Sequence, residues 1–415
     1  MFIQPKVGFK GASYWEPLGI GYLIAIVKEN TSLDTEFFSG AFDDDETILK
    51  ACENADYVGF SCTTPQMAHA LALAREIKKR NACAKIILGG WHATVAPNDA
   101  IKNKEIDYVV VGEGENGLLD IFKVKQQHSR GVIISRSIED LDTLPYPDRD
   151  GIKVQRHIDT AFKENRKRMT SVQGGRGCPF RCTFCGEILM SGGKIRRRGV
   201  QNLLDEIEKI VDIYKIDLIK FVDPEVNSSK KWIKEFCRAI IERKLKVEFE
   251  ANVHAALVDY EMLRLMKMSN FQQINVGVET GSPRIMSGIS KQTSIEQVRK
   301  VFSWSKELGL ERRAYFMLGF PDETVDDIEM TFDLAREIEP DVVGMTMLCP
   351  FPGTLYYKNY EGKDIDWSAA DEYTNDFHST RNFSNMELKA IQKRFISEFS
   401  GKLCYRQAGQ REQLA

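Results

Sequence analysis

The sequence predicts an α/β protein with two successive parallel-sheet domains. Strand-like and helix-like segments alternate from residue 1 to about 125, and again from 169 to 350. Alternation of this kind is typical of parallel strands joined by helical crossovers. Between the two regions, residues 126–168 lose periodicity and contain a proline-rich stretch at 144–148, so we expect a linker there. A small helical cap is expected over 351–415.

In the first region, the strand-like segments are short, rich in β-branched or aromatic residues, and end at glycine or small polar residues. They are Val58–Cys62, Lys85–Leu88 and Tyr108–Val111. A helix is expected over Gln66–Arg80, where small and apolar residues recur at helical spacing. Together these elements predict an open, doubly wound sheet.

Small, hydroxyl and acidic residues follow the strands of this sheet. Ligands of doubly wound sheets bind at the carboxyl ends of the strands. A ligand site is therefore one interpretation, and tight strand-to-helix turns are the other. No GxGxxG follows the first strand, which argues against a dinucleotide. The candidate residues are Ser61, Thr63, Thr64, Gly89, Gly90, Gly112 and Glu113.

The second region predicts about six β/α units, fewer than the eight of a closed barrel. A helix is expected over Lys230–Arg243, and Ser294 with Gln297 forms a capping-box pattern before another. Pro321 with the acids after it predicts a further helix start, and Asn385–Phe399 reads as an amphipathic helix. The expected strands are Met169–Gln173, Leu218–Val222, Val247–Ala251, Ile274–Val278, Arg313–Leu318 and Val342–Leu348.

Three of the nine cysteines lie within eight residues, as Cys178, Cys182 and Cys185. Three thiolates on one short loop can hold three corners of a [4Fe–4S] cluster and leave one iron open. Structural zinc needs four closed ligands, and the nearest histidines, His157 and His254, form no such pairing. The spacing therefore favours an iron–sulfur site.

The composition excludes some partners. The 415 residues include 57 lysines and arginines against 60 aspartates and glutamates, a formal net charge of −3. This balance gives no overall attraction for nucleic acid or an anionic membrane. The N-terminal residues lack the pattern of a signal peptide, and the apolar stretch 17–27 is too short to span a bilayer. We expect a soluble cytoplasmic protein.

The motif CxxxCxΦC, with Phe184 as Φ, resembles the signature of radical S-adenosylmethionine (SAM) enzymes. The segments 17–19, 63–65, 88–94 and 111–115 resemble the cobalamin-binding domain of one subfamily. This resemblance implies a flavodoxin- or Rossmann-like cobalamin-binding-type domain followed by a partial (β/α)6 TIM-type barrel. The DxHxxG loop that ligates cobalt in many cobalamin proteins is absent, so the resemblance leaves the binding of cobalamin open.

The resemblance also implies roles for individual residues. Phe184 would flank adenine, Asp223 would take the place of the amine-binding carboxylate, and Glu279 would contact the ribose of SAM. The structural alternative for Phe184 is a core residue of the loop. The structural alternative for Glu279 is an ordinary strand-to-helix turn. No catalytic residue stands out, and the candidates at strand ends are His254, Tyr315 and Cys349.

The leading hypothesis is a cobalamin-dependent C-methyltransferase that acts on a small-molecule intermediate through a 5′-deoxyadenosyl radical. An external low-potential donor such as flavodoxin or ferredoxin would reduce the cluster. The first alternative is a cobalamin-independent radical SAM dehydratase, oxidoreductase or cyclase of natural-product or lipid biosynthesis. The second is a non-catalytic iron–sulfur protein.

Overall fold

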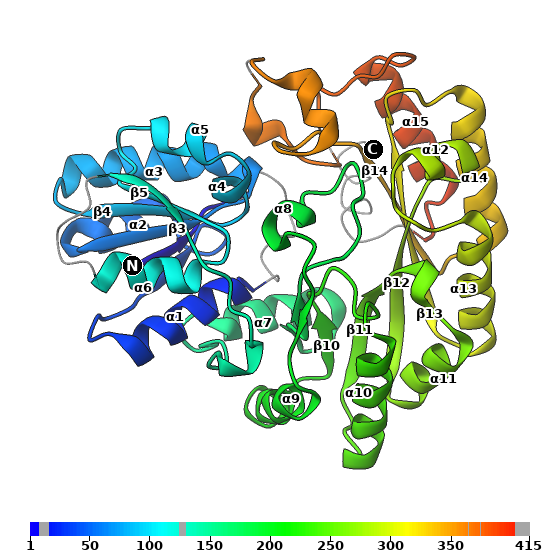
Figure 1. The fold of residues 1–415 in the computed structure, drawn as a ribbon, viewed down its shortest axis with the longest axis horizontal. Helices are drawn as coiled ribbons and strands as arrows, with labels where there is room; N and C mark the ends of the chain where they lie inside the picture. The colour runs from blue at the N-terminus through cyan, green and yellow to red at the C-terminus, as the bar shows by residue number, and fades with distance from the viewer. Residues whose placement is uncertain (8–15, 124–129, 364, 374, 403–415) are drawn as a thin grey trace. The chain divides into compact units, whose positions relative to one another are not determined.

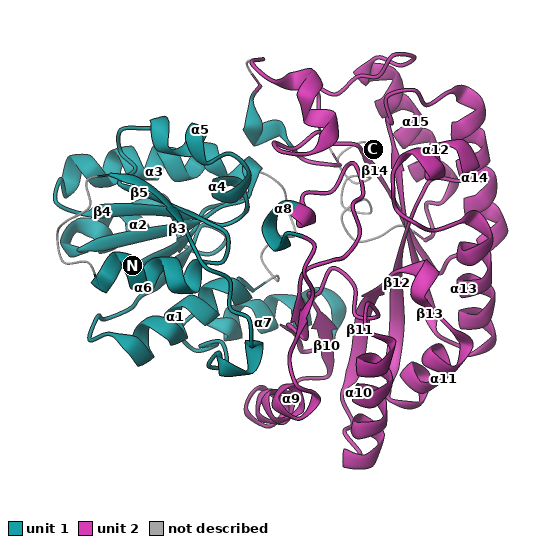
Figure 2. Cartoon of the chain, in the orientation of Figure 1, with its two compact units in different colours: residues 1–166, 189–192, 366–370 teal, residues 167–188, 193–365, 371–415 magenta. Residues whose placement is uncertain are grey.

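The structure is a computed structural model that describes residues 1–7, 16–123, 130–363, 365–373 and 375–402. The chain forms two compact units, coloured separately in Figure 2. Unit 1 contains residues 1–166, 189–192 and 366–370, and unit 2 contains residues 167–188, 193–365 and 371–415. The boundary expected at 125/126 falls outside the described residues.

Unit 1 is built on a sheet of six parallel strands in the order β2-β1-β3-β4-β5-β6. Helices cover both faces, with α1 beside α6 on one and α3 on the other (Figure 1). This arrangement confirms the doubly wound fold. The strands are β1 (Phe2–Gln4), β2 (Phe37–Ser39), β3 (Tyr57–Ser61), β4 (Lys85–Gly89), β5 (Tyr108–Val111) and β6 (Gly131–Ile134). The helices are α1 (Leu18–Asn30), α2 (Asp45–Ala51), α3 (Met67–Arg80), α4 (Trp91–Val95), α5 (Pro97–Lys102), α6 (Gly114–Lys123) and α7 (Val154–Asn165), with 3-10 turns η1 (Cys52–Asn54), η2 (Thr64–Gln66) and η3 (Leu141–Thr143).

Residues 130–166, most of the segment expected to be a linker, belong to unit 1. This segment supplies the edge strand β6 and the helix α7. Its Leu141 and Leu144 are buried against α1, in a cluster with Leu18 and Tyr22. The proline-rich stretch follows them onto the same helix, where the Asp148 N–H donates to the carbonyl of Gly21 at 3.0 Å. Burial of these apolar side chains fixes the segment.

Unit 2 is built on a second sheet of six parallel strands, in the order β14-β13-β12-β11-β10-β7. Each crossover carries at least one helix, and Figure 1 shows these helices along the outer side of the sheet. Among the described residues β7 and β14 do not pair with each other, so the barrel is partial, as expected. The strands are β7 (Met169–Val172), β10 (Leu218–Phe221), β11 (Glu248–Val253), β12 (Phe271–Glu279), β13 (Glu311–Leu318) and β14 (Val342–Met347). The helices are α9 (Val200–Tyr214), α10 (Lys230–Arg243), α11 (Tyr260–Met268), α12 (Pro283–Gly288), α13 (Ile295–Glu307), α14 (Val325–Ile338) and α15 (Asn385–Glu398), with 3-10 turns η4 (Ala255–Leu257) and η5 (Leu355–Tyr360).

Local signals set most of these boundaries. The capping box of Ser294 and Gln297 is present at the start of α13. The helix expected to start at Pro321 begins only at Val325, because a second capping box, Thr324 with Asp327, fixes its first turn. Residues 321–324 form the loop after β13 instead.

One short piece of the C-terminal segment belongs to unit 1. The 3-10 turn η6 (Trp367–Ala369) packs against η2 and α3. The cap expected over 351–415 is therefore divided, since η5 and α15 belong to unit 2. Among the described residues, no helix combines the length and the apolar composition that a membrane crossing requires.

Candidate functional site

The cysteine loop is closed at its base by a small antiparallel ribbon. Strand β8 (Gly175–Arg176) pairs with β9 (Arg196–Arg197), and the three cysteines lie between them with helix α8 (Glu187–Ser191). A Cβ atom at Gly175 would lie 2.7 Å from the carbonyl oxygen of Arg196, so the two strands approach as closely as only glycine permits. The ribbon thus fixes both ends of the loop.

The three thiols are partly buried and none forms a disulfide. Burial raises the pKa of Cys178 to about 11 and that of Cys182 to about 12, and it also raises the pKa of Cys185. Iron binds the thiolate, so loading the loop releases protons. Within the described ranges no three His, Cys, Asp or Glu side chains form a preformed metal cage. The loop fits a [4Fe–4S] cluster by its donor chemistry: three neighbouring free thiols that one cluster can draw together.

The ribbon also connects the cysteine loop to the end of strand β10. Arg197 donates to Asp223 at 2.5 Å and to the carboxylate of Glu225 at 3.3 Å. The second oxygen of Asp223 accepts from the Gly174 N–H at 2.8 Å. Burial raises the pKa of Asp223 to about 6 and that of Glu225 to about 7, against the opposing charge of Arg197.

This arrangement separates the roles of the two carboxylates. Both oxygens of Asp223 have partners within the protein, which places this side chain in the wall of the site. Glu225 is also buried, but its Oε1 has no hydrogen-bond partner among the described residues. Of these three residues, only Asp223 was predicted from the sequence; Glu225 and the partly buried Arg197 were not.

Glu279 lies at the carboxyl end of β12, where the strand is irregular and its φ is +65°. Its carboxylate forms a buried ion pair with the ammonium of Lys291. The positive charge of Lys291 also acts on Cys182, so the pair lies near the cysteine loop. Lys291 was missed in the sequence, where it stands in an unremarkable polar stretch before α13.

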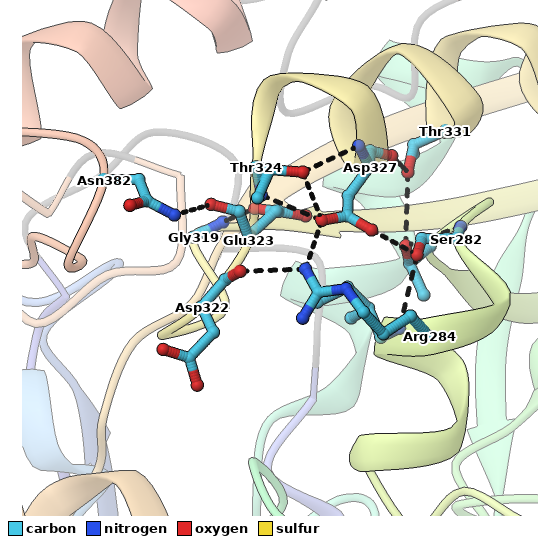
Figure 3. Close-up of polar contacts among 11 residues, drawn as sticks. Ser282, Arg284, Gly319, Asp322, Glu323, Thr324, Asp327, Thr331 and Asn382 are labelled. Atoms are coloured by element: carbon cyan, nitrogen blue, oxygen red, sulfur yellow. Dashed lines mark hydrogen bonds and ion pairs between the residues drawn. The ribbon is translucent and has the colours of Figure 1, made fainter.

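Phe184 connects the cysteine loop to the loop after β13. Its ring meets that of Phe320 edge-on, with centroids 6.3 Å apart. The loop after β13 is itself held by polar contacts (Figure 3). Glu323 accepts from the Gly319 N–H at 2.6 Å, and Asn382 donates to the carbonyl of Glu323 at 2.8 Å. Burial raises the pKa of Glu323 to about 7.

The three weak catalytic candidates lie in different surroundings. His254 follows β11, is buried, and stacks on Phe180 of the cysteine loop. Tyr315 is half-buried on β13, with its hydroxyl 3.3 Å from Arg313. Cys349 is buried after β14, and burial raises the pKa of its thiol. Of the three, the contacts place His254 beside the cluster loop.

In unit 1, the carboxyl ends of β3, β4 and β5 bring together the other predicted residues. The loop after β3 begins at Ser61, and its Thr63 caps η2. The hydroxyl of Thr64 lies 3.2 Å from Nδ1 of His92, which follows β4 and was missed in the sequence. These contacts join the β3 and β4 loops into one edge.

The glycines at this edge allow the loops to approach one another. The carbonyl of Gly89 accepts from the Cys62 N–H at 3.0 Å. Gly90 has a φ of +88°, and a Cβ there would lie 2.7 Å from the nitrogen of Cys62. The Gly112 N–H donates to Thr94 at 3.0 Å, and Glu113 accepts from the Ile138 N–H at 3.1 Å. These contacts hold the loops after β3, β4 and β5 together at the carboxyl edge of the sheet.

Comparison with known proteins matches one family to each of the two regions that carry the candidate sites. Residues 172–335 match the Radical SAM superfamily and residues 6–122 match the B12 binding domain. An uncharacterised methyltransferase of Pyrococcus horikoshii is 28% identical over 82% of this chain and 78% of its own. An anaerobic magnesium-protoporphyrin IX monomethyl ester cyclase of Rubrivivax gelatinosus is 27% identical over 85% of this chain and 68% of its own.

The fold is also that of a solved structure. The radical SAM methyltransferase TsrM of Kitasatospora setae superposes with a TM-score of 0.70, at 18% identity, over 86% of this chain and 74% of its own. The chain therefore carries a B12 binding domain before a radical SAM domain, and these two domains imply a [4Fe–4S] cluster and SAM as cofactors and support cobalamin as a third.

Proposed function

We propose that the protein is a cobalamin-dependent radical SAM C-methyltransferase that acts on a small molecule. The observation that carries the proposal is the presence in one chain of a three-thiol loop in a partial barrel and a cobalamin-type edge on a doubly wound sheet. The methyltransferase among the relatives supports the same reaction class.

The chain's own residues have separate tasks in this proposal. Cys178, Cys182 and Cys185 hold the cluster. Glu225 accepts hydrogen bonds from the amino group of SAM through its unpartnered oxygen, and Glu279 accepts from the ribose. When bound, the cluster supplies the electron that cleaves SAM, and cobalamin carries the methyl group. A low-potential donor such as flavodoxin or ferredoxin supplies that electron, in the cytoplasm.

At the unit 1 edge, the glycine-lined loops after β3, β4 and β5 hold cobalamin in the proposal. Gly90 and Gly112 both have a positive φ, which glycine adopts without strain, so they set the sharp turns of the loops at this edge. The hydroxyls of Ser61 and Thr63 lie at the same edge.

The test uses the anaerobically reconstituted full chain with cobalamin, SAM and a chemical reductant, and measures two products by chromatography. We expect 5′-deoxyadenosine from reductive cleavage of SAM. We also expect S-adenosylhomocysteine, which forms when reduced cobalamin takes the methyl group of SAM, so no substrate is needed. Cys182→Ala should lose 5′-deoxyadenosine, and Cys83→Ala, at an exposed cysteine outside the loop, should not.

Each contrary outcome has a defined meaning. If the cobalamin-loaded protein makes 5′-deoxyadenosine but no S-adenosylhomocysteine, methyl transfer is wrong and a cyclase- or dehydratase-type reaction takes its place, as the cyclase relative allows. If Cys182→Ala keeps the activity of the wild type, the radical SAM assignment of this loop is wrong.

A further inference from the structure

His254 and Phe180 form the closest ring contact in unit 2 that involves the cysteine loop. Phe180 lies between Cys178 and Cys182 in the sequence. The imidazole lies parallel to its ring, with the centroids 3.6 Å apart and 7° between the planes. Both side chains are buried. The wall of the cysteine loop therefore rests directly on a residue that follows strand β11.

The imidazole has a fixed position. Asn227 binds the backbone of His254 twice, accepting from its N–H at 2.9 Å and donating to its carbonyl at 3.1 Å. Nε2 lies 2.9 Å from the carbonyl oxygen of Lys291. A carbonyl oxygen only accepts, so Nε2 carries the proton of the ring.

A neutral imidazole whose proton is already hydrogen-bonded within the protein does not suit acid–base chemistry. Burial and the positive charge of Lys291 lower the pKa of His254 to about 4. Its proton is held by the Lys291 carbonyl, and its Nδ1 is buried without a partner among the described residues. The candidate role as a general acid or base therefore has no support in the geometry, and a mechanical role does.

The contacts of His254 run in two directions. On one face it supports Phe180 and with it the loop of the cluster ligands. At its edge it binds the backbone of Lys291, whose ammonium pairs with Glu279 at the end of β12. These contacts link the cysteine loop to Glu279, and a SAM molecule that reaches from the cluster to Glu279 would meet both.

We propose that His254 is a positioning residue that keeps the cysteine loop in register with the Lys291–Glu279 pair, so that SAM reaches the cluster and its ribose site together. The proposal rests on the proposed function in two respects, the cluster at the three cysteines and the ribose contact of Glu279. A small displacement between the two halves of a binding site weakens the binding of a ligand that must contact both halves.

The test separates the two directions of contact. His254→Phe keeps an aromatic ring against Phe180 but loses the hydrogen bond to Lys291. Phe180→Leu keeps that hydrogen bond but loses the stacking. For each variant and for the double variant, we would measure KM for SAM and kcat for 5′-deoxyadenosine formation, and record the electron paramagnetic resonance spectrum of the reduced cluster with and without SAM.

Each single variant should raise KM for SAM by about tenfold with kcat changed less than about twofold, as expected when binding rather than chemistry is affected. The SAM-induced spectral change should need correspondingly more SAM. The double variant should be no worse than the poorer single variant, because two links in one chain are not additive. His254→Gln, which keeps an amide donor for the Lys291 carbonyl but loses the ring against Phe180, should behave like Phe180→Leu.

His157→Phe is the matched control, because His157 is also buried and meets Phe42 edge-on, but in unit 1. It should leave KM and the spectrum unchanged. If the wild type cleaves SAM, two results would overturn this proposal. One is a wild-type KM and spectrum in both single variants, and the other is additive losses in the double variant. If a single variant does not fold, the His254→Gln values decide. A wild type that binds no cluster would instead overturn the proposed function.

Discussion

At the scale of single residues, Glu225 carries a conflict between folding and binding. It is a buried carboxylate with one oxygen bonded to Arg197 and Ser228 and the other without a partner in the described part of the chain. A buried polar atom that lacks a hydrogen-bond partner costs free energy of folding. The ammonium group of a bound ligand would supply the missing donor, so the cost is recovered on binding.

Glu225→Gln tests this conflict. Burial raises the pKa of Glu225 to about 7, so the folded protein holds its proton more tightly than the unfolded chain does. The wild type therefore loses stability from this group as the pH rises through about 7, and the glutamine does not. We expect a higher melting temperature at pH 8 without ligand, and a KM for SAM raised at least about tenfold.

The control for that comparison is Glu235→Gln, at an exposed position on α10. It should change neither the melting temperature at pH 8 nor KM. A Glu225→Gln variant with the wild-type KM would show that the amino group of SAM is held elsewhere.

The same residues show what the sequence could not resolve. The three cysteines can be identified from the sequence because all three lie on one short loop. The choice between Asp223 and Glu225 depends on Arg197, which is 26 residues away and reaches them only through the β8–β9 ribbon. In the same segment Arg196 and Arg198 are buried, and Arg198 pairs with Glu206.

At the scale of elements, the network in Figure 3 joins the first turns of two helices that follow different strands. Asp327, in the first turn of α14, accepts from Ser282 at the start of α12 and from Thr324. It also forms an ion pair with Arg284. Burial alone would raise the pKa of Asp327, but these hydrogen bonds outweigh it and hold the pKa well below its usual range.

Asp327→Asn should therefore destabilise the protein by about 1–3 kcal/mol at neutral pH, the usual cost of weakening hydrogen bonds to a buried charge. Because the pKa is lower in the folded protein, the contribution of the carboxylate is complete above the ordinary carboxyl pKa and is lost as the pH falls. The difference between variant and wild type should shrink in acid. Urea unfolding at pH 7 and pH 3 measures it.

Asp326→Asn is the neighbouring control, since Asp326 is exposed in the same helical turn. It should unfold close to the wild type at both pH values. A difference for Asp327→Asn that does not change with pH would mean that the network does not depend on the charge of Asp327.

Elements with strong local signals were predicted well and elements without them were not. The helix over Lys230–Arg243 and the box at Ser294 are present as expected. Strand β6 has four residues, and nothing in GVII separates an edge strand from a linker. The burial of Leu141 and Leu144 depends on α1, more than a hundred residues earlier in the chain, so no local pattern reveals it.

At the scale of the whole molecule, the two candidate cofactor sites lie in different compact units. Each set of loops is fixed by its own sheet: the cysteine loop by the β8–β9 ribbon, and the cobalamin-type edge by β3, β4 and β5. Loading of one site should therefore not require the other.

Two substitutions in the full chain test this independence. Cys182→Ala should lose iron but keep the wild-type cobalamin content. Gly90→Ala should lose most of the cobalamin and keep its iron, because a Cβ at a φ of +88° and 2.7 Å from Cys62 distorts the edge. Metal analysis and the visible spectrum of the purified proteins measure both.

Gly59→Ala is the control in strand β3 beside that edge, where a Cβ would meet Phe2 at an ordinary 3.7 Å. It should keep both cofactors. Loss of cobalamin in Cys182→Ala, or of iron in Gly90→Ala, would show that the two sites are loaded together.

The turn η6 has a consequence for how the protein is made. It completes unit 1 against η2 and α3, although residues 366–370 follow all six strands of the second sheet in the chain. A ribosome therefore synthesises all six strands of the second sheet before the last part of unit 1. Until residues 366–370 have been synthesised, the surface of unit 1 at η2 stays uncovered.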